Sequence, residues 1–155
     1  MNNSFAHFAE KGNEFMEVLA ERMGSPADAD HAFRVLKAVL HTLRDHIPVS
    51  VSLHFISALP LAIKAVYVDG WKPGKKKRSL RHKEDLLAEI RRQESPLMAA
   101  HDLKGNAYTA SMIAAVWETL QLYISEGEQA DFLSVLPSNI RTFLNEITSE
   151  RFHLL

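Results

Sequence analysis

The feature that most constrains the fold of this sequence is an internal doubling at a constant offset of 77 residues. No gap is needed across the matched stretch. The pairs are Ala38–Ala115, Val39–Val116, Thr42–Thr119, Leu43–Leu120, Ile47–Ile124, Phe55–Phe132, Ser57–Ser134, Leu59–Leu136, Pro60–Pro137 and Ile63–Ile140. Chance agreement between helical stripes would repeat hydrophobicity alone, whereas here Thr, Ser and a Leu-Pro dipeptide recur as well. We therefore expect a duplicated unit of about four helices.

Helical spacing dominates the pattern of apolar residues along the chain. Gly24 is expected to end the first helix, because glycine adopts a left-handed C-terminal conformation cheaply. Ser25-Pro26 then resembles the start of the next helix. The stripes are Phe15, Leu19 and Met23; Phe33, Leu36, Leu40, Leu43 and Ile47; and Ile113, Val116, Leu120 and Ile124.

These patterns predict an all-α fold, in which two tandem pseudo-symmetric repeats of about four helices form one bundle. Residues 1–155 are interpreted as a single helical domain, with repeat one at 13–68 and repeat two at 84–147. A basic linker loop at 69–83 joins the repeats. The segment 1–11, which contains two phenylalanines, is expected to add a helical cap.

Several local signals support this division. The Leu-Pro dipeptides predict corners between short helices, because proline is favoured at the first helical position and restricts the residue before it. Ser125 to Glu128 fits a capping box. Trp71, beside Gly70, is expected to pin the linker against the helices, and Trp117 is expected in the core.

Composition excludes several classes of protein. The chain has no cysteine, so disulfides, thiolate metal sites and cysteine nucleophiles are ruled out. No apolar run approaches the ~18 residues that a membrane-spanning helix needs. The first residues lack the basic-then-apolar order of a signal peptide. We expect a cytoplasmic protein without membrane contact.

Charge is unevenly distributed along the chain. Six cations lie within nine residues, and subtracting them from the net charge of −1 leaves −7 on the remainder. These candidate binding residues are Lys75, Lys76, Lys77, Arg78, Arg81 and Lys83. They could contact phosphates, with Tyr67 and Trp71 near enough in sequence to stack on bases. The acidic remainder opposes a polyanion, so a solvated linker and docking on an acidic partner are the alternatives.

Eight histidines raise the question of a metal or acid–base site. No pair has the spacing of three or four residues that suits helical metal ligands. His41 and Asp45 share a helical face, and His54 lies on the next predicted helix, so these three could meet after folding. The simpler interpretation is a set of partly exposed polar side chains. No catalytic residue, metal or cofactor is predicted, since hydrolase and phosphate-loop motifs are also missing.

The segments AVLHTLRDHI, LPLAIKAVYVDGWKP, KEDLLAEI and AVWETLQLYISEGEQADFLSVLPSNIRTFL together resemble the bacterial domain-of-unknown-function family 2267. The likeness covers about residues 13 to 147 and departs from the family pattern between Gln93 and Tyr108. It implies a helical fold in a bacterial, intracellular setting. The family offers no activity to carry over, so no residue gains a catalytic role from it.

The function expected from the sequence is that of a non-enzymatic interaction module, which binds a protein partner or associates with itself. The alternative from another class is an anion or nucleic-acid binder that uses the segment 75–83.

Overall fold

The structure is a computed structural model that describes residues 4–74, 80–94 and 105–153. These residues form helices, turns and connections without a strand, so the predicted all-α class is confirmed. The helices are α1 (Ser4–Arg22), α2 (Ala29–Asp45), α3 (Val49–Ile56), α4 (Leu61–Val68), α5 (Lys83–Glu94), α7 (Gly105–Gln121), α8 (Glu126–Ser134) and α9 (Ser138–His153). None of the helices in this part of the chain is long and apolar enough to cross a membrane.

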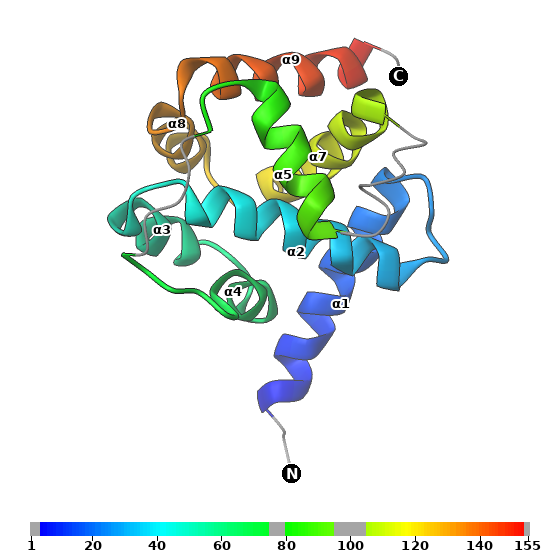
Figure 1. The fold of residues 1–155 in the computed structure, drawn as a ribbon. Helices are drawn as coiled ribbons and strands as arrows, with labels where there is room; N and C mark the ends of the chain where they lie inside the picture. The colour runs from blue at the N-terminus through cyan, green and yellow to red at the C-terminus, as the bar shows by residue number, and fades with distance from the viewer. Residues whose placement is uncertain (1–3, 75–79, 95–104, 154–155) are drawn as a thin grey trace.

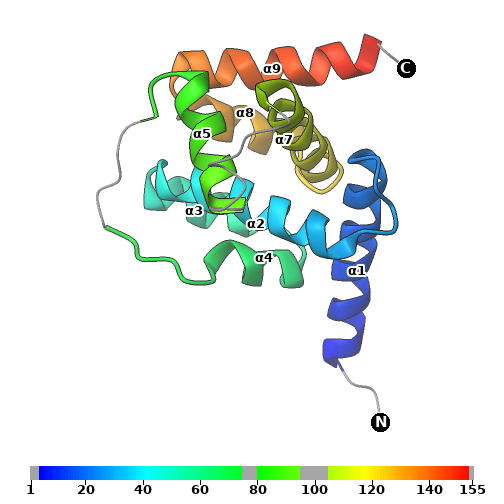
Figure 2. The same cartoon turned by 45° about the vertical axis from the view of Figure 1, so that its right-hand side comes forward.

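Two 17-residue helices, α2 and α7, form the centre of the molecule (Figure 1). Helix α2 packs against α1, α4, α5 and α7, while α7 packs against α1, α2, α5 and α9. Both helices bury apolar side chains on more than one side, as expected of elements surrounded by others. Figure 2 shows α9 across one end of the bundle and α1 projecting from the other.

The packing pairs correspond between the two halves. Exchanging α1 with α5, α2 with α7, α3 with α8 and α4 with α9 converts each main packing pair into a main packing pair, and α2–α7 and α3–α8 map onto themselves. Phe55 and Phe132, which match at the offset of 77, stack on each other with ring centroids 4.7 Å apart. This correspondence is one of helix order and of which helices pack together. That the two halves superimpose stays a prediction.

The two Leu-Pro corners have the same hydrogen bonds. Leu59 and Leu136 are buried, and each donates its N–H to the carbonyl three residues earlier. The carbonyls of Pro60 and Pro137 each accept two N–H groups from the first turn of the following helix. Each corner therefore turns the chain from one short helix into the next helix while its leucine enters the core.

Helix ends follow the predicted chemistry in part. Gly24 has φ 78° and ends α1 as expected, with the Ser25 N–H bonded to the Ala20 carbonyl. The N-cap of α2 is Asp28, whose carboxylate accepts the His31 N–H, so the expected start at Ser25-Pro26 is wrong. The carboxylate of Asp28, further along the chain than Ser25, caps the helix instead.

The capping box at α8 is confirmed for the serine. Ser125 Oγ accepts the Glu128 N–H at 3.2 Å and also lies 3.0 Å from the Glu128 carboxylate. The carboxylate thus contacts the serine hydroxyl, whereas a full capping box would have it reach the serine backbone N–H.

Two predictions about the apolar residues need correction. Phe33 is 45% exposed, because the buried side of this end of α2 is formed by Ala32, Val35 and Leu36. Residues 4–11 are helical as expected, but they continue into the rest of α1 without a break, so they are not a separate cap over the core. Trp117 is buried as expected.

Candidate functional site

The predicted group of His41, Asp45 and His54 does not form a metal site. Within the described residues, no set of three or more His, Asp or Glu side chains is placed to hold a metal ion. His41 is buried on α2, and Asp45 pairs with Arg44 through Nε at 2.9 Å. His54 is an exposed residue of α3. The expectation that His41 is partly exposed on the outer face is also wrong.

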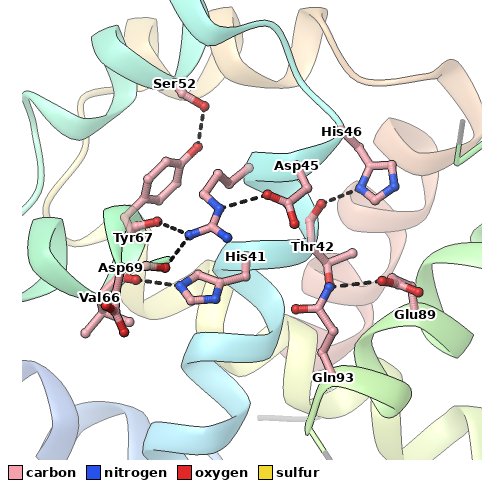
Figure 3. Close-up of polar contacts among 11 residues, drawn as sticks. His41, Thr42, Asp45, His46, Ser52, Val66, Tyr67, Asp69, Glu89 and Gln93 are labelled. Carbon is pink, nitrogen blue, oxygen red and sulfur yellow. Dashed lines mark hydrogen bonds and ion pairs between the residues drawn. The ribbon is translucent and has the colours of Figure 1, made fainter. Parts of the chain in front are cut away.

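A buried arginine, Arg44, joins α2 to the end of α4 through three residues that Figure 3 labels, Asp45, Tyr67 and Asp69. Its side chain is 6% exposed, and Nη1 donates to the carbonyls of Tyr67 and Asp69, both at 2.8 Å. Its Nε donates to Asp45. The last carbonyls of a helix lack partners within the helix. Arg44 donates to these carbonyls from the neighbouring helix, and its positive charge neutralises the negative end of the α4 dipole.

His41 acts beside Arg44 on the same helix end. Its Nε2–H donates to the Val66 carbonyl at 2.6 Å (Figure 3). The next carbonyl, that of Tyr67, accepts from Arg44. Burial lowers the pKa of His41 below its ordinary value of 6.5, because a charged imidazole loses hydration inside the bundle. The histidine is therefore a neutral donor in the folded protein near pH 7.

Tyr67 completes the cluster from α4. Its hydroxyl shares a hydrogen bond of 2.7 Å with Ser52 of α3, and its ring lies edge-on to Trp71. Burial raises the pKa of Tyr67 to about 12, because the phenolate would be poorly solvated. Trp71 is half-buried here, in agreement with its expected role as an anchor of the linker.

The position of Arg44 in the sequence already indicates that its side chain is buried, which the pattern of apolar residues alone does not show. Arg44 lies four residues after Leu40 and three before Ile47, so it occupies the apolar side of the α2 stripe. A charged residue at such a position needs hydrogen-bonding partners. The cluster of Arg44, His41 and Tyr67 is thus a structural clamp among α2, α3 and α4.

A cleft of about 650 Å³ lies next to this clamp, between the two halves of the molecule. Residues 43–49 form one wall, residues 70–74 and Leu80 another, and the second Leu-Pro corner with Ile140 the third. Its exposed lining is almost evenly polar and apolar, with Arg44, Asp45, His46 and Lys72 as the charged or titratable groups. Its size lies within the range of small-molecule sites.

The predicted basic site is only partly within the described residues. Lys75, Lys76, Lys77 and Arg78 lie outside them. Arg81 and Lys83 are exposed, and the Arg81 carbonyl accepts the Asn139 side-chain amide at 3.1 Å. Lys83 opens α5. Phosphate binding by this segment stays a prediction.

The tip of α1 is an apolar surface that the sequence did not single out. Phe5 is 75% exposed and Phe8 39% exposed, and both lie beyond the point where α1 meets α4. Residues 4–9 contain no Asp, Glu, Lys or Arg. We call residues 4–9 the α1 tip; Figures 1 and 2 both show it projecting from the bundle.

Comparison with known proteins assigns the chain to a family but assigns it no activity. The model of the family described as "Uncharacterized conserved protein (DUF2267)" matches residues 12–143. No curated protein matches the chain. The match covers both Leu-Pro corners, the Arg44 cluster and the cleft, and ends before the last turns of α9. The chain therefore belongs to the DUF2267 family of uncharacterized conserved proteins.

Proposed function

We propose that this protein is a non-enzymatic interaction module of the bacterial cytoplasm that pairs with a second copy of itself through the α1 tip. The observation that carries the proposal is the course of the apolar stripe along α1. Phe8, Gly12, Phe15 and Leu19 are spaced by four, three and four residues, so they share one face of the helix. The last three are buried in the bundle, whereas Phe8 and the nearby Phe5 are exposed.

The opposite face of α1 argues for a protein partner over a lipid surface. Glu10, Glu14, Glu17 and Glu21 are all exposed and repeat with the same spacing, which places them opposite the apolar stripe. Helices that lie in membrane interfaces usually carry Lys and Arg on their polar face, because most cellular membranes are anionic. This acidic face would be repelled from such a membrane.

A second copy offers a matching surface. Gly12 meets Ala62 at the crossing of α1 and α4, and the outer face of α4 exposes Leu61, Ala65 and Val68. In a two-fold pair, the tip of one copy can cover α4 of the other and receive the same cover in return. The glutamate stripe then remains in water. Charge-poor, apolar centres of this kind are typical of homodimer interfaces.

Sedimentation equilibrium of the purified chain and of Phe5→Ser tests the proposal. We expect a concentration-dependent dimer for the natural sequence and at least a tenfold weaker association constant for the variant, since both copies lose a phenylalanine. Leu53→Ser is the matched control, because Leu53 is 60% exposed on α3. A monomer at every concentration, or equal weakening by both substitutions, would contradict the proposal.

The exposure of Arg81 and Lys83 favours the alternative function, anion or nucleic-acid binding by the segment 75–83. A gel shift with labelled nucleic acid at low salt tests it. The alternative predicts a shift that disappears when Lys75, Lys76, Lys77 and Arg78 are replaced by Ala. An unshifted band at low salt contradicts it.

A further inference from the structure

We propose that the cleft beside Arg44 binds a small molecule that combines an apolar body with one anionic group. This inference is independent of the self-association proposed above, since the cleft lies on the linker side of α2 and α3 and shares no residue with the α1 tip or the outer face of α4. It rests on the donors of Arg44, the charge of the cleft and the shape of its apolar walls.

The first observation concerns a donor with no partner. The hydrogen bonds of Arg44 use Nε and both hydrogens of Nη1, which is three of the five N–H groups of a guanidinium. No hydrogen bond joins Nη2 to any described residue, and Nη2 is not one of the buried atoms left without a partner, so it is open to solvent on a side chain that lines the cleft. A guanidinium nitrogen placed in this way can donate to a bound acceptor, and a carboxylate, sulfonate or phosphate oxygen is the strongest.

The second observation concerns the charges that a ligand would meet. Among the described residues that line the cleft, Arg44 and Lys72 are positive and Asp45 is negative. Asp45 is already paired with Arg44 Nε, so the remaining positive charge is available to an anion. Helices α3 and α9 also begin at the cleft, and Pro48 gives α3 no side-chain cap. The positive ends of two helix dipoles therefore add to the preference for an anion.

The third observation concerns the apolar walls. Leu43, Trp71, Leu80, Leu136 and Ile140 face the same space from both halves of the molecule. Trp71 is half-buried, so part of its surface remains open to a ligand, and an aromatic wall suits a flat ring or an extended chain. A volume of about 650 Å³ lies within the range of small-molecule sites.

The test uses two fluorescent probes that differ only in charge. Anilinonaphthalene sulfonate carries the anion, and N-phenylnaphthylamine has the same rings without it. We expect the sulfonate to bind the full chain at one saturable site at least fivefold more tightly than the uncharged probe. Lys72→Glu should weaken the binding of the sulfonate about tenfold, because it reverses one nearby charge. The affinity for the uncharged probe should stay within about twofold.

Two tryptophan substitutions locate the site without touching Arg44, whose replacement could unfold the chain. Val49→Trp places a large ring at the cleft edge and should abolish the binding of both probes. Leu53→Trp is one turn further along the same helix, does not line the cleft, and should bind normally. Equal affinity for the two probes, or normal binding by Val49→Trp, overturns the proposal. Loss of the signal in Phe5→Ser also overturns it, because the probe would then be on the α1 tip.

Discussion

Arg44 shows how a single buried side chain can join two helices. Its guanidinium links α2 to the end of α4, and the hydroxyl of Tyr67 in turn links α4 to Ser52 of α3. A buried charge is costly unless its hydrogen bonds are satisfied. Here two backbone carbonyls and one carboxylate supply that compensation, so the residue fixes the position of the α4 end relative to α2.

Replacing Arg44 by Met should lower the free energy of unfolding by about 2–4 kcal/mol, because Asp45, the buried carbonyl of Tyr67 and the part-buried carbonyl of Asp69 lose this donor. Urea unfolding followed by circular dichroism measures the change. Arg92→Ala is the matched control: Arg92 also pairs with a carboxylate, but its side chain is 64% exposed. Exposed pairs contribute about 0–1 kcal/mol. Equal losses for the two variants would contradict the structural role assigned to Arg44.

His41 predicts a specific dependence of stability on pH. The unfolded chain binds a proton at this residue near pH 6.5, whereas the folded chain does so only at a lower pH, because burial lowers the pKa of His41. Its contribution is therefore fully present above pH 6.5 and is lost as the pH falls from 6.5 through the folded pKa. Urea unfolding at pH 7.5 and 5.5 should show a larger acid-induced loss in the natural chain than in His41→Gln. Equal acid-induced losses of stability in the two proteins would contradict this role of His41.

At the residue scale, the sequence predicted which side chains are buried better than it predicted their partners. The burial of Phe15 and Leu36 follows from spacing along one helix. The bonds of Arg44 and His41 to α4 depend on where two helices cross, and periodicity within one helix contains no information about that crossing. A polar residue on an apolar stripe indicates that a partner exists without naming it.

The crossing of α1 and α4 is so close that a glycine is needed at residue 12. A Cβ added at Gly12 would lie 2.6 Å from the Cβ of Ala62, which cannot rotate away. Gly12→Ala should therefore destabilise the fold by about 1–2 kcal/mol, because the cost of overpacking exceeds the ~1 kcal/mol that alanine gains within a helix. Gly127→Ala in α8 meets no atom within 4 Å and should be neutral or stabilising. Thermal unfolding of both variants tests this, and a stabilised Gly12→Ala would mean that the helices separate easily.

At the element scale, helix existence was more predictable than helix ends. Gly24 and Ser125 were recognised because their roles depend on local backbone chemistry alone. The true cap of α2, Asp28, was missed because Ser25-Pro26 offers an equally good local signal three residues earlier. Only the packing of α2 against its neighbours determines which of two adequate signals begins the helix.

For the molecule as a whole, the doubling of the sequence predicts one core made from two similar sets of helices. Phe55 and Phe132 meet where the halves join, and α2 lies against α7. The α1 tip departs from this arrangement, because α5, the counterpart of α1, has no such extension in the described residues. The sequence showed two phenylalanines there, but amphipathic spacing alone cannot distinguish an apolar face that packs within the chain from one that packs against another chain.

The most direct test of the proposed pairing is a distance between two α1 tips in solution. The chain has no cysteine, so Ala9→Cys carries a single spin label, and any pulsed-dipolar distance must join two molecules. The proposal predicts a distance below about 30 Å, because each tip would pack about 8–10 Å from α4 of the other copy, and that α4 crosses its own α1 at Gly12 and Ala62. It also predicts that adding Phe5→Ser removes the signal. No dipolar coupling at concentrations where the chain sediments as a dimer, or coupling that survives Phe5→Ser, would contradict the proposal.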